Sequence, residues 1–286
     1  MTILITGANG QVGRELQAIS AEFPTLKLIP VDRSMLDISD PEAIAHFCDT
    51  TEFDVCINCA AYTAVDKAEQ EKELAYAINA EAPGHLAAAC LDKGAQLIHY
   101  SSDYVYHNQE NRPLQETDAT TPRGVYAQSK LEGDLKVLAA HPGALVFRTS
   151  WVYSSFGHNF VKTMLRLGAE RDSLRVVVDQ IGSPTYARDI ARMTLELIHS
   201  GQAAQYSGIF NYSNEGVCSW YDFAQAIFEL SGVKCKVEAI PSTEYPTPAA
   251  RPHYSVLDKG KYKAAFGIDI PYWKESLRDC LELLGY

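Results

Sequence analysis

Three glycines near the start of the chain constrain its fold more than any other feature. Gly7, Gly10 and Gly13 directly follow the apolar run Ile3–Ile5 and directly precede an amphipathic segment over residues 11–22. Glycine is needed where a strand turns sharply into a helix and where a diphosphate must approach the backbone. The free N–H groups and the dipole of the following helix favour that anion. The glycine run therefore predicts a dinucleotide site, because it opens a βαβ unit.

Short apolar runs then alternate with amphipathic segments through the N-terminal half. The expected strands after the first are Lys27–Val31, Asp54–Asn58, Gln96–Tyr100 and Ala144–Arg148, and the expected helices are 41–48, 71–93 and 124–139. This order favours a parallel sheet with helices on both faces, and strands that are apolar throughout suit a sheet covered on both sides. We expect an α/β fold with a Rossmann-type, doubly wound parallel sheet.

The regular alternation weakens after residue 150. Aromatic residues, Pro and Gly become frequent, and the proline density of residues 240–254 suits a fixed loop rather than a helix or a central strand. We expect residues 1–150 to form a dinucleotide-binding domain. Residues 151–286 are expected to form mainly a smaller C-terminal substrate lobe, with segments around 186–212 returning to the first domain.

The composition excludes several classes of partner. A formal net charge of −11 disfavours general binding to nucleic acid or to an anionic membrane. The seven cysteines show no regular framework, and an odd number of them fits reduced thiols in a reducing compartment. There is no signal-peptide pattern and no apolar stretch that approaches about 18 residues. We therefore expect a cytoplasmic protein with no membrane or nucleic-acid partner.

The second expected strand is followed by two residues that favour different cofactors. Asp32 can accept hydrogen bonds from a ribose 2′-hydroxyl, as in NAD sites, whereas Arg33 can pair with the 2′-phosphate of NADP. Both are present, so either NADH or NADPH is expected. Asp37 and Ile38 follow where an adenine could be bracketed. Small residues in 58–62 would let the nicotinamide ribose approach the third strand.

The residues of clearest catalytic type lie between the fourth and fifth expected strands. Tyr126 and Lys130 are four positions apart, which places both side chains on one face of a helix. A lysine ammonium next to a phenol lowers the pKa of the phenol, so Tyr126 is expected to exchange a proton near neutral pH. Ser102 ends the fourth strand and offers a hydroxyl to the same reacting oxygen.

Together these residues resemble the extended, sugar-nucleotide branch of the short-chain dehydrogenase/reductase superfamily. Further segments narrow the resemblance to the dTDP-4-dehydrorhamnose reductase family. These segments are Ala60–Glu69, Ser101–Tyr106, Arg148–Tyr153, Asn159–Arg166, Asp179–Thr185 and Tyr245–Pro252. The similarity spans essentially the whole chain.

The resemblance implies a role for each matching residue. Tyr126 donates the proton, Lys130 supports it and holds the ribose, and Ser102, a position that is often Thr in this family, orients the sugar oxygen. The expected cofactor-binding residues are Gly7, Gly10, Gln11, Val12, Gly13, Asp32, Arg33, Asp37, Ile38, Ala60, Ala61, Tyr62, Tyr100, Tyr126 and Lys130. The expected substrate-binding residues are Ser102, Asp103, Tyr104, Trp151, Asn159 and Arg251, of which Arg251 would pair with the substrate diphosphate.

Some members of this family are described as Mg²⁺-bound dimers in which glutamates at the interface hold the metal. Glu15 matches one of those positions. The resemblance therefore extends to a Mg²⁺ ligand at Glu15 and to a homodimer.

The activity that the resemblance implies is reduction of the C4 ketone of dTDP-4-dehydro-β-L-rhamnose to dTDP-L-rhamnose, a precursor of surface polysaccharide. Two alternatives stay open. One is another enzyme of the branch, an epimerase or a 4,6-dehydratase, although dehydratases carry an Asp-Glu pair where this chain has Asp103 and Tyr104. The other is a non-catalytic, NADP-binding regulatory subunit, like the subunit of methionine adenosyltransferase that resembles these reductases.

Overall fold

Six apolar segments pair side by side as a parallel sheet in the computed structural model, which describes residues 1–107 and 110–286. Their order across the sheet is β10-β5-β4-β3-β1-β2. The strands are β1 (Thr2–Thr6), β2 (Lys27–Val31), β3 (Val55–Asn58), β4 (Gln96–Ser102), β5 (Leu145–Thr149) and β10 (Gly208–Asn211). The reversal of strand order between β1 and β3 is the topology of a doubly wound, Rossmann-type sheet, so the predicted fold class is confirmed.

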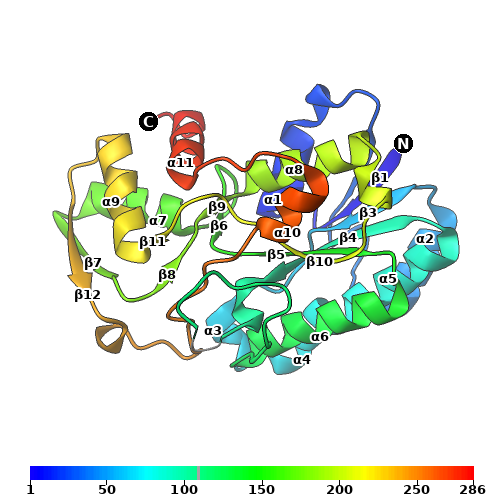
Figure 1. The fold of residues 1–286 in the computed structure, drawn as a ribbon, viewed down its shortest axis with the longest axis horizontal. Helices are drawn as coiled ribbons and strands as arrows, with labels where there is room; N and C mark the ends of the chain where they lie inside the picture. Colours follow the sequence, from blue (N-terminus) through cyan, green and yellow to red (C-terminus); the bar gives the residue numbers. More distant parts are fainter. Residues whose placement is uncertain (108–109) are drawn as a thin grey trace.

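Helices cover both faces of this sheet (Figure 1). One face packs on α1 (Gln11–Ala18) and α8 (Ala187–His199), and the other packs on α2 (Pro41–Thr50), α5 (Ala82–Lys93) and α6 (Val125–Ala140). Alternate residues of each strand serve the two cores, as Ile5 and Leu4 do in β1. This double burial explains why the strands are apolar throughout.

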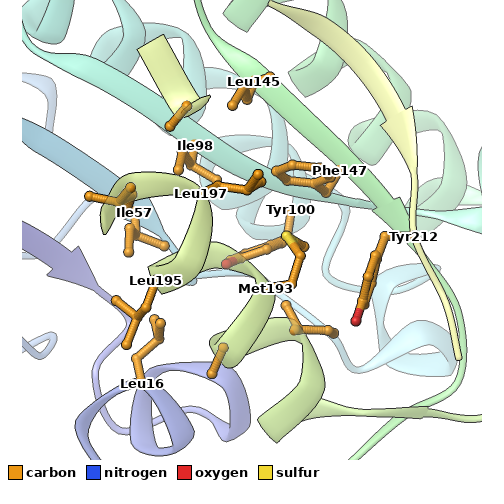
Figure 2. Close-up of a cluster of buried hydrophobic side chains, with 14 of the residues drawn as sticks. Leu16, Ile57, Ile98, Tyr100, Leu145, Phe147, Met193, Leu195, Leu197 and Tyr212 are labelled. Carbon is orange, nitrogen blue, oxygen red and sulfur yellow. The ribbon is translucent and has the colours of Figure 1, made fainter. Parts of the chain in front are cut away.

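The core between α8 and the sheet positions β4, the strand that ends at Ser102 (Figure 2). Met193, Leu195 and Leu197 of α8 lie over side chains of β3, β4 and β5, and all three are buried. Tyr100 of β4 lies in the same core, where its hydroxyl is 2.7 Å from the hydroxyl of Thr194. Each such buried side chain contributes about 1.5–3 kcal/mol to the free energy of unfolding, so β4 is held firmly.

A second, smaller lobe lies beside the sheet, on the left of Figure 1. Its helices are α7 (Phe160–Glu170), α9 (Trp220–Ser231) and α11 (Trp273–Leu283), and they pack around the parallel strands β7 (Ser173–Val177) and β12 (Lys236–Ile240). Short strand pairs link the two parts: β6 (Val152–Tyr153) with β9 (Thr185–Tyr186), and β8 (Ile181–Gly182) with β11 (Cys218–Ser219).

The C-terminal half of the chain does not stay in the lobe. Strand β10 pairs with β5, α8 packs on α1, and α10 (Gly260–Phe266) places Tyr262 and Phe266 in the core beside the sheet. Helix α10 is therefore a further segment in contact with the sheet, besides the region around 186–212.

The predicted single helix over residues 71–93 is wrong in one respect. It consists of α4 (Lys72–Tyr76), a π-helical turn over Ala77–Glu81 and α5. The wide turn brings the side chain of Asn79 to the backbone of Tyr62, which it bonds through both its oxygen and its nitrogen. π turns occur mostly as single turns inside α-helices, and they are frequent at functional sites.

Other boundaries differ by a few residues from the predicted ones. Helix α1 ends at Ala18 and is followed by a 3₁₀ turn over Ser20–Glu22, and β4 continues to Ser102. All seven cysteines are free, and five of them are buried. No helix among residues 1–107 and 110–286 is long and apolar enough to span a bilayer.

The contact between α6 and the π turn gives the first prediction. A Cβ at Gly133 would lie 2.0 Å from the carbonyl oxygen of Asn79, whereas a Cβ at Gly84 of α5 would meet only the side chain of Lys136, at 3.1 Å. We expect Gly133→Ala to lower the free energy of unfolding by about 3 kcal/mol, because two helix backbones must separate.

The matched control is Gly84→Ala, which we expect to change the free energy of unfolding by no more than about 1 kcal/mol. Urea denaturation followed by circular dichroism measures both variants. Equal stability of the two variants would contradict the account of this helix contact.

Candidate functional site

The carboxyl ends of four neighbouring strands meet at one edge of the sheet, which is where ligands bind in folds of this type. The register aligns Thr6 of β1 with Asn58 of β3, and Ser102 of β4 with Thr149 of β5. The loops that follow these strands therefore lie side by side. The strand ends and the loops after them carry the glycine run, residues 59–62, Ser102 and Trp151.

The glycine run forms a turn that only glycine can build. Gly7 has a φ of +66°, and a Cβ on it would lie 2.5 Å from the backbone nitrogen of Ala60. A Cβ on Gly13 would lie 2.6 Å from the carbonyl oxygen of Gly7. The first amides of α1 point out of this turn, and no side chain caps them. The turn fits a dinucleotide diphosphate, because bare backbone N–H groups face the edge of the sheet.

The segment after β3 is held against the glycine turn by two asparagines. Asn58 accepts hydrogen bonds from the hydroxyl of Thr6 (2.7 Å) and from the amide of Ala60 (3.2 Å). Asn79 bonds the amide of Tyr62 at 2.8 Å and its carbonyl at 3.0 Å. The predicted residues Ala60, Ala61 and Tyr62 are thus brought beside the loop. Sequence reasoning missed Asn79, although a buried asparagine in an alanine-rich helix was a signal.

Asp32 and Arg33 lie at the end of β2, on the same edge. Asp32 accepts hydrogen bonds from Asn9 and Ser34, which lower the pKa of its carboxyl. Arg33 pairs with Asp37 at 3.1 Å, and its side chain is 73% exposed. Ile38 is buried in the core beneath them. An ionised carboxylate and a mobile guanidinium are therefore both available to a bound ribose.

Helix α6 carries Tyr126 and Lys130, the pair that the sequence predicts to be catalytic. Its first amide, that of Val125, donates a 2.8 Å hydrogen bond to Glu69, a residue that sequence reasoning did not select and that stabilises the helix N-terminus. Tyr126 follows in the first turn. Its ring packs edge-on against Tyr104, with centroids 5.5 Å apart, and Ser102 lies near enough to its hydroxyl to lower the pKa of the phenol. The structure thus brings Ser102 and Tyr126 together, as the sequence predicted.

The expected effect of Lys130 on Tyr126 is not what the structure shows. Burial raises the pKa of Tyr126 to about 12, and the opposing influence is the hydrogen bond from Ser102 rather than the charge of Lys130. The ammonium of Lys130 instead donates a 2.7 Å hydrogen bond to the carbonyl of Tyr100. Tyr126 is therefore a neutral acid that holds its proton firmly.

A buried ion pair lies behind Lys130. Asp134, one turn further along α6, bonds the guanidinium of Arg148 at 3.0 Å, and both side chains are inaccessible to solvent. Burial lowers the pKa of Lys130 to about 8, while the negative charge of Asp134 opposes that shift. Lys130 can therefore lose its proton only slightly above neutral pH.

Tyr100 reaches the site through its backbone alone. Its side chain lies in the core beneath α8 (Figure 2). The predicted cofactor role of Tyr100 is thus limited to the carbonyl that holds Lys130.

Some of the predicted substrate residues line a cavity, and others do not. Tyr104 and Arg251 line a cavity of about 810 Å³ between the sheet edge and the lobe. Asp103 is buried behind Ser102, which donates to it at 3.0 Å, and burial raises the pKa of Asp103 to about 6. Trp151 has a φ of +47° and stacks at 3.6 Å on Trp220, which forms part of the cavity wall.

Asn159 is occupied by protein partners. Its oxygen accepts the amide of Lys162 at the start of α7, and its nitrogen donates to Gln11 at 2.9 Å and to the carbonyl of Ser154 at 2.7 Å. Its amide therefore joins the lobe to the first residue of α1, and Asn159, which was predicted to bind substrate, is not among the residues that line the cavity.

Glu15 also has a structural role. It is fully buried in α1, where it accepts hydrogen bonds from Arg188 at 2.9 Å and from Ser154 at 2.6 Å. An arginine of the same chain thus balances its charge. Within the described ranges, no group of three or more His, Cys, Asp and Glu side chains could hold a metal. The predicted Mg²⁺ ligand at Glu15 is therefore not supported.

The rest of the cavity wall combines aromatic, aliphatic and charged side chains. Phe160, Met164 and Trp220 supply apolar surface. The cations are Arg171, Arg175 and Arg251, of which Arg175 pairs with Glu244 and Arg251 with Asp66. A flat heterocycle that carries an anionic chain would suit such a wall.

Comparison with known proteins agrees with this geometry over the full length of the chain. The family model described as RmlD substrate binding domain matches residues 1–285. The dTDP-4-dehydrorhamnose reductase of Escherichia coli K12 is 40% identical over 99% of this chain and 98% of its own length.

Two solved structures are similar throughout. A dTDP-4-dehydrorhamnose reductase from Clostridium acetobutylicum superposes with a TM-score of 0.95 at 43% identity, over 100% of both chains. The Bacillus anthracis dTDP-4-dehydrorhamnose reductase, solved in complex with NADP, superposes with a TM-score of 0.93 at 37% identity, over 99% of each chain. This chain therefore belongs to the RmlD substrate-binding-domain family, that of the dTDP-4-dehydrorhamnose reductases.

Proposed function

We propose that the protein uses NADPH or NADH to reduce the C4 ketone of dTDP-4-dehydro-β-L-rhamnose to dTDP-L-rhamnose. The observation that carries the proposal is the placement of Ser102, Tyr126 and Lys130 at the same sheet edge as the glycine turn. A carbonyl reductase must bring a hydride donor and a proton donor to the same carbonyl group. The glycine turn can hold the cofactor that donates the hydride, and Tyr126 can donate the proton. We expect this reduction of a nucleotide sugar to take place in the cytoplasm, a reducing compartment that suits the seven free cysteines.

The chemistry divides simply between cofactor and protein. The nicotinamide, when bound, supplies the hydride. The hydroxyl of Ser102, which donates to Asp103 in the structure, would turn to donate a hydrogen bond that orients the ketone oxygen, and the phenol of Tyr126 gives that oxygen its proton. The ammonium of Lys130, which the carbonyl of Tyr100 holds, is the group that we expect to bind the nicotinamide ribose.

The cavity beside Tyr104 is where we expect the nucleotide part of the substrate to bind. Trp220 and Phe160, whose rings lie 4.6 Å apart, form an aromatic wall for the base, and Arg251 can pair with the diphosphate. Tyr104 lies between this cavity and Tyr126. The sugar would then reach the catalytic residues while its nucleotide stays in the lobe.

The competing activities have less support. Water elimination needs a second carboxylate next to Asp103, and Tyr104 occupies that position. An epimerase regenerates its cofactor, so it would not consume NADPH. A purely regulatory subunit has no need of a phenol, a serine hydroxyl and a lysine gathered at the cofactor edge, as Tyr126, Ser102 and Lys130 are.

The direct test is an absorbance assay at the nicotinamide band. Purified protein with dTDP-4-dehydro-β-L-rhamnose should oxidise NADPH or NADH in proportion to the ketosugar added. Absence of oxidation with both cofactors would refute the proposal.

Replacement of the acid tests its assignment. We expect Tyr126→Phe to lower kcat by about 10²–10⁴-fold, because the variant retains the ring but lacks the proton. Its affinity for NADPH, measured by fluorescence titration, should stay within a factor of two. Full activity in this variant would exclude Tyr126 as the proton donor.

The shifted pKa of Lys130 predicts a pH dependence. The protonated ammonium is the active form, so kcat/KM should fall as the pH rises through about 8, where Lys130 loses its proton. Tyr126, with a pKa of about 12, should not titrate in that range.

The variant Lys130→Arg tests whether Lys130 causes this alkaline limb, the fall of kcat/KM above pH 8. Its guanidinium stays charged to a pH of about 12, so the limb should lie at a higher pH even if the rate falls. A limb that remains near pH 8 in this variant would belong to another group.

Arg33 is placed to determine the preference between NADPH and NADH. Arg33 is exposed and can turn from Asp37 to a 2′-phosphate. We expect Arg33→Ala to raise KM for NADPH about tenfold, which is the effect of about 1.4 kcal/mol, and to change KM for NADH by less than twofold. Arg166→Ala, which removes an exposed arginine paired within α7, is the control. An equal effect on both cofactors would rule out recognition of the phosphate by Arg33.

A further inference from the structure

One carboxylate bridges the sheet edge and the proline-rich loop of the lobe. Asp66 lies in α3 (Val65–Ala68), the short helix that follows β3. One of its oxygens accepts a 2.8 Å hydrogen bond from Nη2 of Arg251, and the other accepts a 3.1 Å bond from the backbone amide of Ala249. These residues are more than 180 positions apart in the sequence.

The same carboxylate fixes the direction of the guanidinium. Nη1 of Arg251 donates to the carbonyl of Ala249 at 3.0 Å, and Thr247 donates to that carbonyl at 2.9 Å. The two bonds of Arg251 use two of its five N–H donors, so others stay available to an anion. Asp66 and Arg251 both line the 810 Å³ cavity.

The pair is too exposed to be explained by stability alone. The side chains of Arg251 and Asp66 are 19% and 41% exposed, and ion pairs in such positions contribute little to the free energy of unfolding. Burial raises the pKa of Tyr104, and of the nearby charges Arg251 lowers it and Asp66 raises it. Asp66, Arg251 and Tyr104 line the same cavity, and the ring of Tyr104 contacts Tyr126.

Asp66 is also linked to the cofactor side of the site. It comes four residues after Tyr62 and six after Ala60, whose backbone lies against Gly7. A short stretch of chain thus connects the glycine turn to the guanidinium of Arg251.

We propose that Asp66 is a positioning residue that orients Arg251 toward the diphosphate of the nucleotide substrate. The inference rests on the proposed function. Asp66 touches neither the reacting carbonyl nor the hydride, so its removal should weaken substrate binding and leave the chemical step unchanged.

The experiment compares Asp66→Asn with the wild-type protein by two readouts. In steady-state assays we expect KM for the dTDP-ketosugar to rise about tenfold, with kcat and the KM for NADPH changed by less than twofold. Calorimetry with dTDP alone, which needs no turnover, should show a Kd raised by a similar factor. Glu229→Gln is the control, because Glu229 forms an ion pair in the lobe, with Lys274, and does not line the cavity.

A double variant tests whether Asp66 acts through Arg251. Asp66→Asn combined with Arg251→Gln should bind dTDP no more weakly than Arg251→Gln alone. Additive losses, or unchanged dTDP affinity in a folded Asp66→Asn protein, would overturn the inference. So would a wild-type protein that does not bind dTDP.

Failure of the proposed function gives a different result. A wild-type protein that binds dTDP but does not oxidise NADPH with the ketosugar would refute the reductase activity. The effect of Asp66→Asn on dTDP affinity would still decide the role of Asp66. If Asp66→Asn does not fold, Asp66→Glu is the second variant. It retains the charge, and we expect it to recover most of the dTDP affinity.

Discussion

The backbone of Gly7 lies against the backbone of Ala60, and the rest of the site depends on this contact. A single added Cβ would come within 2.5 Å of the neighbouring strand end, so the turn after β1 and the segment after β3 fit together only with glycine. This contact sets the floor on which a dinucleotide can lie. Helix α3 follows five residues after Ala60, and its Asp66 meets the loop of the lobe. The proposed cofactor and substrate sites thus share one short stretch of backbone.

Burial shifts the pKa values of the two proposed catalytic groups, Tyr126 and Lys130. Tyr126 is a firmly protonated acid because its phenol is desolvated, whereas Lys130 is close to losing its proton for the same reason. Asp134 and Arg148 form a neutral pair behind Lys130, and this pair limits how far the pKa of the lysine can fall. The site therefore keeps an acid protonated and a cation charged near neutral pH without direct contact between the two.

The fold and the centre of the site could be predicted from the sequence because they depend on local patterns. The glycine spacing requires a strand-to-helix turn, and a separation of four on a helix brings Tyr126 and Lys130 to one face. The misses are tertiary. They depend on residues more than 90 positions away in the sequence. Tyr100 is hydrogen-bonded to Thr194 in the core, Asn159 to Gln11, and Glu15 to Arg188. The π turn that places Asn79 and the loop that brings Arg251 to Asp66 leave no periodic signal in the sequence.

The central claim is that this sheet edge transfers a hydride to a sugar ketone while Tyr126 protonates its oxygen. Its most direct test is a labelled turnover with dTDP-4-dehydro-β-L-rhamnose and NADPH carrying deuterium at the transferable position of the nicotinamide. The account predicts one equivalent of NADP⁺ for each sugar reduced, and a product with one deuterium at C4 by mass spectrometry and NMR. A product without deuterium at C4, or turnover without net oxidation of NADPH, would contradict it.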